Sequence, residues 1–110
     1  AEIQQVIINI IGNAVKYTPN NGTSEIALQK MGSVAHFEVN DTGYGIPRDQ
    51  QEKMFQPFFR AKTDETQTID GTGLGLYLVK RIIERNKGRI IFRSEYGVGS
   101  TFGFELPIAD

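Results

Sequence analysis

The stretch DGTGLGLYLVK, residues 70–80, decides which folds are open to this sequence. Glycines stand at positions 71, 73 and 75, and the apolar periodicity after them predicts a helix. Because glycine tolerates positive φ, the loop can turn directly into a helix whose first backbone N–H groups lack partners within the helix. Such a helix start is suited to binding a phosphate group.

Two common phosphate-binding motifs do not fit this stretch. A P-loop has Gly-Lys followed by Ser or Thr, and no such triplet occurs at the required spacing. A dinucleotide-binding fingerprint follows a strand and has a third glycine where Leu76 stands, whereas residues 61–70 are polar and aperiodic. We therefore expect a long loop before the helix, which is either a functional lid or a disordered segment.

The composition is that of one ordinary globular domain. Among 110 residues, 12 are basic and 13 acidic, so the overall charge favours neither nucleic acid nor an anionic membrane surface as a partner. No cysteine is present, which excludes disulfides and thiolate metal sites. The sequence has no apolar run long enough to span a membrane and no signal-peptide pattern. We expect a single soluble domain over residues 1–110, excised from a larger protein.

Periodicity predicts the element order helix, hairpin, loop, helix, hairpin. Helices are expected at 2–17 and 72–86. Strands, joined in pairs by glycine turns, are expected at 24–31, 34–41, 89–95 and 100–106. In the later helix, two neighbouring rows are apolar, one containing Leu78 and the other Val79, and Gly88 is expected as the C′ residue. Residues 48–60 show a short helical pattern with several phenylalanines, which we expect to anchor the lid.

Polar side chains line one edge of the first predicted helix. Asn9, Asn13 and Lys16 are spaced at i, i+4 and i+7, so they lie along one side. This edge is either a solvated polar face or a site for a metal and phosphates. An asparagine carbonyl is a hard oxygen ligand suited to Mg²⁺, which takes its other ligands from water and substrate phosphates.

Asp41 stands at the end of the second predicted strand, on the face that Phe37 and Val39 turn toward the core. A carboxylate there needs a hydrogen-bond donor. The donor is either the backbone of the following turn, residues 41–47, or a ligand amine. The glycines of that turn, Gly43 and Gly45, let backbone approach a flat ligand. His36 falls on the opposite face, where we expect it to be solvent-exposed and assign it no role.

These segments together resemble the ATP-binding domain of sensor histidine kinases, within the superfamily of gyrase-type topoisomerases, heat-shock chaperone ATPases and mismatch-repair ATPases. The resemblance covers nearly the whole chain. NIIGNAVKYTP (9–19) is similar to the N box of the family, DTGYGIP (41–47) and GTGLGL (71–76) to its two glycine boxes, MFQPFFR (54–60) to its F box, and GVGSTFGFELP (97–107) to its closing strand. It implies an α/β (α+β) two-layer sandwich of the Bergerat type, with helices covering one face of a mixed, largely antiparallel sheet.

The resemblance also implies a Mg-ATP site with a lid over residues 56–74. Asn13 would bind Mg²⁺, Lys16 would reach the phosphates, and Asp41 would accept a hydrogen bond from the adenine amino group. Asn13, Lys16 and Arg60 would serve catalysis, and Thr101 would hold a water beside Asp41, although strand alternation puts Thr101 on the face opposite Phe102. The other implied nucleotide contacts are Asn9, Tyr17, Gly43, Gly45, Ile46, Gly71, Thr72, Gly73, Leu74, Gly75 and Leu76.

Asn9 indicates the reaction class. ATP-hydrolysing members of the superfamily carry a Glu at the position that Asn9 occupies, and an amide cannot act as a general base at neutral pH. The resemblance therefore implies transfer of the γ-phosphate to a histidine on a separate dimerisation domain of the same protein, and from there to a response regulator. His36 lies in a predicted strand and is not that acceptor. We expect the domain to be cytoplasmic, whether or not its parent protein is anchored in a membrane. Alone, it is expected to be a monomer that binds ATP without phosphorylating itself.

Two other functions on the same fold stay open. One is a non-catalytic nucleotide-sensing or interaction domain, against which the intact Asn13, Lys16 and Asp41 argue. The other is a relative that phosphorylates serine on a partner protein, as anti-sigma-factor kinases do. The long F-box and lid segment argues against this second alternative, because those relatives look shorter there.

Overall fold

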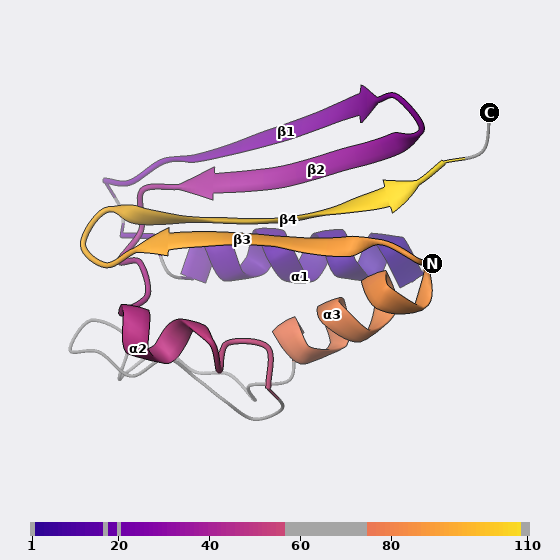
Figure 1. Ribbon diagram of the computed structural model, residues 1–110. Helices are drawn as coiled ribbons and strands as arrows, with labels where there is room; N and C mark the ends of the chain where they lie inside the picture. Colours follow the sequence, from indigo (N-terminus) through magenta and orange to yellow (C-terminus); the bar gives the residue numbers. More distant parts are fainter. Residues whose placement is uncertain (1, 17, 20, 57–74, 109–110) are drawn as a thin grey trace.

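The chain folds into two layers, with a sheet on one side and helices on the other (Figure 1). The structure is a computed structural model, and it describes residues 2–16, 18–19, 21–56 and 75–108. The helices are α1 (Glu2–Lys16), α2 (Arg48–Gln51) and α3 (Gly75–Arg85). The strands are β1 (Ser24–Met31), β2 (Val34–Asp41), β3 (Arg89–Glu95) and β4 (Gly99–Pro107). None of the helices in this described part of the chain has the length and apolar character needed to cross a membrane.

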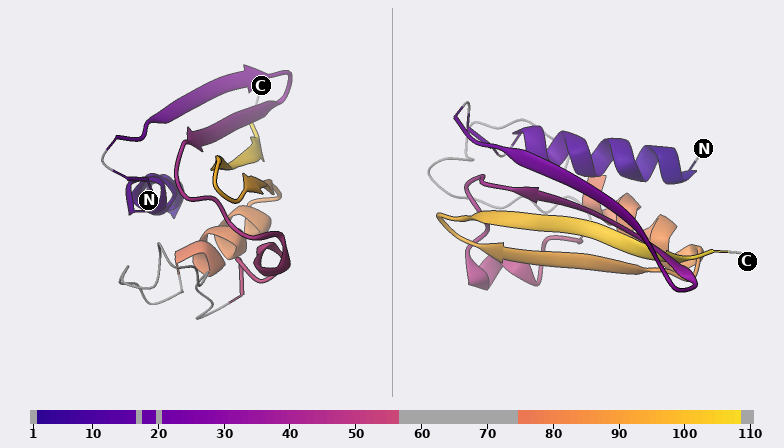
Figure 2. Two further views of the ribbon diagram at one scale, coloured as in Figure 1. Left: turned by 90° about the vertical axis from the view of Figure 1, so that its left-hand side faces the viewer. Right: turned by 90° about the horizontal axis from the view of Figure 1, so that it is seen from above.

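The sheet has the strand order β1-β2-β4-β3, and each pairing among these strands is antiparallel. The hairpins β1–β2 and β3–β4 turn at Gly32 and Gly97, which have φ values of 65° and 85°. Viewed along the strands, the helices lie on the same side of the sheet (Figure 2). The predicted two-layer fold is therefore confirmed, and the predicted strands agree with the observed ones to within one residue at each end.

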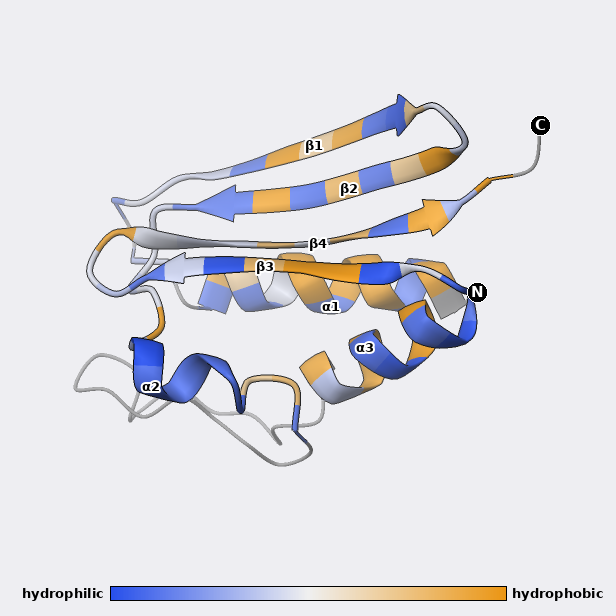
Figure 3. Cartoon of the chain, viewed as in Figure 1, coloured by the Kyte–Doolittle hydropathy of each residue, from blue (hydrophilic) through white to orange (hydrophobic). Residues whose placement is uncertain are grey.

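The core lies where α1 and α3 pack against the middle of the sheet. Among the described residues, the largest fully buried side chains are Val6 and Ile10 of α1, Val39 of β2, and Val79 and Ile83 of α3. Burying side chains of this size stabilises the fold by about 1.5–3 kcal/mol each. Hydrophobic and hydrophilic residues alternate along β2, as a strand with one buried face requires (Figure 3).

The two apolar rows predicted for α3 are not buried equally, since among the described residues the row of Val79 contains the buried side chains and the row of Leu78 reaches the core only through the partly buried Ile82. Val79 is buried, but the side chain of Leu78 is 46% exposed. Neighbouring rows of a helix point in different directions, and α1 and β3 contact α3 on the Val79 side. At the beginning of the predicted lid, Phe55 packs edge-on against Phe92, with ring centroids 5.7 Å apart, as expected for an anchor. Phe58 and Phe59 lie outside the described residues.

The C-terminal end of α3 corrects the role expected for Gly88. The residue with positive φ is Lys87, at 65°, and its N–H donates to the Glu84 carbonyl at 3.0 Å. The N–H of Gly88 donates to the Ile83 carbonyl at 2.9 Å. This pattern is a Schellman motif in which Lys87 is C′ and Gly88 is C″. Gly88 is needed for space, because a Cβ there would overlap the backbone carbonyl oxygen of Glu105.

Substitutions at these two positions should have opposite effects on stability. Gly88→Ala should lower the free energy of unfolding by about 1–3 kcal/mol, because the added methyl meets backbone that cannot move away cheaply. Lys87→Gly should raise it by about 0.5–1 kcal/mol, because glycine accepts the left-handed conformation without strain. Urea unfolding of both variants measures the two changes. A neutral Gly88→Ala variant would contradict the close approach of α3 to β4.

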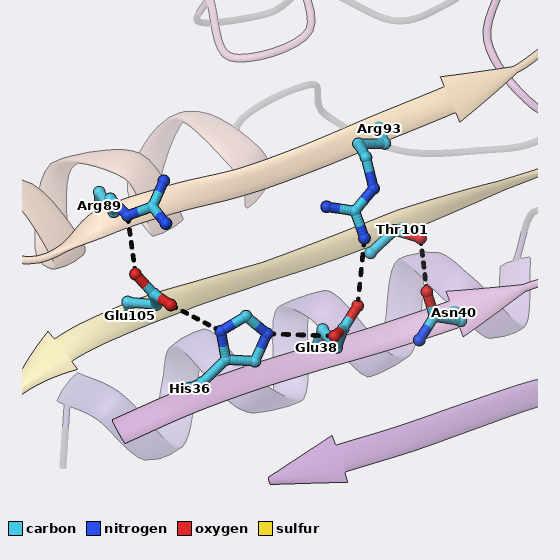
Figure 4. Close-up of polar contacts among 7 residues, drawn as sticks. All are labelled: His36, Glu38, Asn40, Arg89, Arg93, Thr101 and Glu105. Atoms are coloured by element: carbon cyan, nitrogen blue, oxygen red, sulfur yellow. Dashed lines mark hydrogen bonds and ion pairs between the residues drawn. The ribbon is translucent and has the colours of Figure 1, made fainter. Parts of the chain in front are cut away.

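The outer face of the sheet carries a chain of charged side chains that links β3, β4 and β2 (Figure 4). His36 Nδ1 lies 2.8 Å from Glu105 Oε2, and His36 Nε2 lies 3.1 Å from Glu38 Oε1. Arg89 Nε donates to Glu105 at 2.7 Å, and Arg93 is 3.5 Å from Glu38. The face predicted for His36 is confirmed, but its side chain is only 16% exposed, because both glutamates cover the ring.

The protonated form of His36 fits this position. An ionised carboxylate only accepts hydrogen bonds, so both ring nitrogens must carry a proton to donate to both glutamates. These hydrogen bonds, first that to Glu105 and then that to Glu38, raise the pKa of His36 above its ordinary value. The same bond to His36, followed by that to Arg89, lowers the pKa of Glu105.

The stability of the domain should therefore depend on pH through His36. A raised pKa in the folded state gives a stabilisation that is complete below about pH 6.5 and is lost as the pH rises through the raised value. The free energy of unfolding, measured from about pH 5 to about pH 9, should show this loss in the wild type and not in His36→Gln. Identical pH profiles for the two proteins would show that the ring does not titrate between the glutamates.

Candidate nucleotide-binding site

The C-terminal ends of α1 and β2 come together at one end of the molecule (Figure 1). The Thr18 hydroxyl donates to the Ala14 carbonyl at 2.6 Å and so closes the last turn of α1. Gly22 then brings the chain against the residue after Asp41, since a Cβ on Gly22 would overlap the Thr18 side chain and lie 3.0 Å from the Thr42 hydroxyl. The edge of α1 that carries Asn13 and Lys16, predicted to bind Mg²⁺ and phosphates, is thereby brought next to the end of β2, where Asp41 is predicted to bind adenine.

Asp41 is held between two neighbouring strands. It pairs with Ser24 of β1 and with Ser100 of β4. Its Oδ1 accepts hydrogen bonds from the N–H groups of Gly43, at 2.8 Å, and Ser100, at 3.2 Å. Among the described residues, Oδ2 has no hydrogen-bond partner. The backbone of the turn is thus one donor to Asp41, as one of the two alternatives expected, and a second oxygen is left for another donor.

The carboxyl group of Asp41 is partly buried, and two effects act on its ionisation. Burial raises its pKa above the ordinary value, and the hydrogen bonds from Gly43 and Ser100 oppose that increase. Burial thus makes the negative charge expensive, and the two backbone donors offset part of that penalty. A further donor at Oδ2 would favour the charged form again. The site therefore suits a ligand that presents an N–H group to this edge.

The turn after Asp41 packs against the end of the β3–β4 hairpin. Gly45 has a φ of 72°, and a Cβ on it would overlap the backbone carbonyl of Glu95. The N–H of Gly97, at the tip of the hairpin, donates to the Tyr44 carbonyl at 2.7 Å. Gly43, Gly45 and Ile46 are buried. The turn is therefore a fixed wall beside Asp41, built on glycines for close packing.

Two serines that the motifs in the sequence did not indicate, Ser94 and Ser100, lie behind this turn. The N–H of Ile46 donates to Ser94 Oγ at 2.7 Å, and Ser94 Oγ is 2.8 Å from Ser100 Oγ. Gln51 Nε2 donates to the carbonyls of Ile46, at 2.9 Å, and Ser94, at 3.0 Å. Strand alternation could have indicated Ser100, which lies on the same face of β4 as the buried Phe102.

The structure does not bring Thr101 to Asp41. Thr101 pairs with Asn40, and its hydroxyl donates to Asn40 Oδ1 on the outer face of the sheet (Figure 4). Adjacent residues of a strand point to opposite faces, so Ser100 is the hydroxyl residue on the Asp41 side. The expected placing of Thr101 beside Asp41 is thus corrected, in agreement with the alternation of β4.

The predicted polar edge of α1 is present on the helix. Asn9 and Asn13 are each partly buried, while Lys16 at the last helical position is exposed. Gly75 and Leu76 form the first turn of α3 and are partly buried. A Cβ on Gly75 would meet nothing within 4 Å, so packing among the described residues does not explain this glycine.

Comparison with known proteins shows the family of this chain. A family model described as histidine kinase-, DNA gyrase B- and HSP90-like ATPase matches residues 1–110. The chain belongs to this ATPase family. Its relatives are sensor histidine kinases, such as the adaptive-response sensory kinase SasA of Synechococcus elongatus, which is 42% identical over 107 residues. That match covers 96% of this chain and 27% of SasA, so the chain spans about a quarter of that relative.

Solved structures of histidine kinases share the fold of this ATPase domain. A nucleotide-free catalytic domain of histidine kinase ThkA has a TM-score of 0.80 and 36% identity, and the match covers 96% of this chain and 67% of that one. The structure of ThkA in complex with response regulator protein TrrA has a TM-score of 0.75 and 33% sequence identity, and the match covers 97% of this chain and 28% of the ThkA chain. The structure of full-length ShkA in complex with AMPPNP has a TM-score of 0.82 and 33% sequence identity, and the match covers 98% of this chain and 22% of the ShkA chain. The resemblance to sensor histidine kinase catalytic domains is confirmed.

Several predicted site residues of the ATPase domain lie outside the described residues, and their roles stay predictions. They are Tyr17, Arg60, Gly71, Thr72, Gly73 and Leu74.

Proposed function

We propose that this domain binds Mg-ATP and donates the γ-phosphate to a histidine on a separate dimerisation domain of the same protein. The observation that carries the proposal is the carboxylate of Asp41, which is partly buried and whose Oδ1 takes both backbone donors. Oδ2 accepts neither of these hydrogen bonds and is open to a further donor, and the exocyclic amine of adenine is one. ShkA, which shares the fold, was solved with AMPPNP, an adenine nucleotide.

The polar edge of α1 has the chemistry required for the phosphates. The described residues include no group of three or more His, Cys, Asp or Glu side chains that could hold a metal ion. A Mg²⁺ ion here would depend on the amide oxygen of Asn13, on water and on the phosphates, which is a ligand set that Mg²⁺ accepts. When bound, the ion would neutralise phosphate charge, and Lys16 would add a second cation. The glycines at 71, 73 and 75 would close a lid over the nucleotide.

The acceptor is proposed from the chemistry of Asn9 and from the relatives. Asn9 is an amide, so the edge of α1 has no general base there to activate water, which favours transfer to an external nucleophile over hydrolysis. The relatives are named sensory or sensor kinases, and ThkA was solved with a response regulator. We assign the same order of transfer here, from ATP to histidine to response regulator. The domain itself acts as a monomer in the cytoplasm, where ATP is available.

Replacing Asp41 by Asn tests the adenine contact with little change in shape. Asn Oδ1 can still accept from Gly43 and Ser100, while an amino group replaces Oδ2 and opposes the adenine amine. ATP affinity should fall by about 1–3 kcal/mol, roughly ten- to a hundredfold. Calorimetric titration with ATP and Mg²⁺ measures this, and Asp49→Asn on the exposed surface of α2 is the matched control. Equal affinity of the wild type and Asp41→Asn would exclude adenine recognition by this carboxylate.

Phosphoryl transfer tests the kinase activity itself. The domain, mixed with the dimerisation domain of its own parent and radiolabelled ATP, should label a histidine of that partner in a Mg²⁺-dependent reaction. Asn13→Ala should abolish labelling. Gly12→Ala should keep it, because Gly12 is exposed on α1 and a Cβ there meets nothing within 4 Å. ATP binding without transfer would favour a nucleotide-sensing domain, and labelling of a serine would favour the serine-kinase alternative.

A further inference from the structure

One residue of the turn after Asp41 has both of its backbone polar groups held by side chains from other elements. The N–H of Ile46 donates to Ser94 Oγ of β3 at 2.7 Å, and the carbonyl of Ile46 accepts from Gln51 Nε2, in α2, at 2.9 Å. Gln51 also donates to the carbonyl of Ser94 at 3.0 Å. Ile46 is 4% exposed, so water is a poor substitute for either partner.

Ser94 also connects the backbone of Ile46 to Asp41. Its oxygen lies 2.8 Å from the hydroxyl of Ser100 and 3.3 Å from the Gly99 carbonyl, so its single proton has an acceptor on β4. The backbone N–H of Ser100 in turn donates to Asp41 Oδ1 at 3.2 Å. Hydrogen bonds therefore link Ile46 to Ser94 and Ser94 to the Ser100 hydroxyl, and the backbone of Ser100 completes the connection to the Asp41 carboxylate.

We propose that Ser94 is a positioning residue of the nucleotide site, a role that rests on the proposed function. Its hydroxyl sets the distance between the backbone of Ile46 and Asp41. The turn that contains Ile46 and the Oδ2 atom of Asp41 would then contact the same purine ring in a fixed geometry. Ser94 itself lies on β3 behind the turn and acts through Ile46 and Ser100. Gln51 of α2 holds the carbonyl of the same residue, Ile46.

The variants that test this role are Ser94→Ala, which removes the hydroxyl, and Ser94→Thr, which keeps it. Ser33→Ala is the control, since Ser33 is exposed at the far hairpin. Calorimetry should compare ATP with purine riboside triphosphate, which lacks the 6-amino group. We expect Ser94→Ala to bind ATP roughly tenfold more weakly and to lose much of its preference for ATP over the analogue. Ser94→Thr should restore both. A merely structural defect would weaken both ligands equally.

Amide hydrogen exchange of the ligand-free protein separates this proposal from the proposed function. Loss of the Ser94 hydroxyl should speed exchange of the Ile46 N–H and leave amides at the far end of β2 unchanged. Unchanged exchange at Ile46, or unchanged preference for ATP in Ser94→Ala, would overturn the positioning role. A wild type that binds neither triphosphate would overturn the proposed function and the binding role with it, whereas the exchange result would still report whether Ser94 holds the turn.

Discussion

The antiparallel pairing of β2 with β4 is the constraint on which this structure depends. It joins the hairpins β1–β2 and β3–β4 into one sheet. Glycines allow the approach, since a Cβ on Gly103 would overlap the Phe37 carbonyl and one on Gly99 would overlap the Asp41 carbonyl. A shift of one residue would turn every side chain of a strand to the other face. The register thus decides that Ser100 stands opposite Asp41.

The same register organises both faces of the sheet. On the helix side, Phe37 and Phe104 stand opposite each other, with ring centroids 5.2 Å apart, and cover part of the core. On the outer side, His36 stands opposite Glu105, and their ion pair begins a charged chain across three strands. Apolar burial on one face and charge pairing on the other therefore support a single alignment of β2 and β4.

The candidate site is at the end of this pairing, where the apolar face reaches solvent. On the helix-facing side of the sheet, a carboxylate in the middle of β2 would be buried among apolar side chains, whereas Asp41 at the strand end is partly exposed and receives two backbone hydrogen bonds. The turn that follows is held by β3 and α2 through Ser94 and Gln51. If adenine binds at this edge, as proposed, a turn that is already held in place would lower the entropy cost of binding, because no loop has to become ordered.

The sequence by itself determined the order of the elements, the core faces of β2 and β4 and the position of Asp41 at a strand end, because local periodicity and turn residues report which way a side chain points. Only the tertiary structure decided what each side chain meets. It exposed Leu78, enclosed His36 between two glutamates, gave positive φ to Lys87 rather than Gly88, and placed Ser94 behind the turn. Each of these outcomes depends on residues far away in the chain, which periodicity along a single segment cannot report.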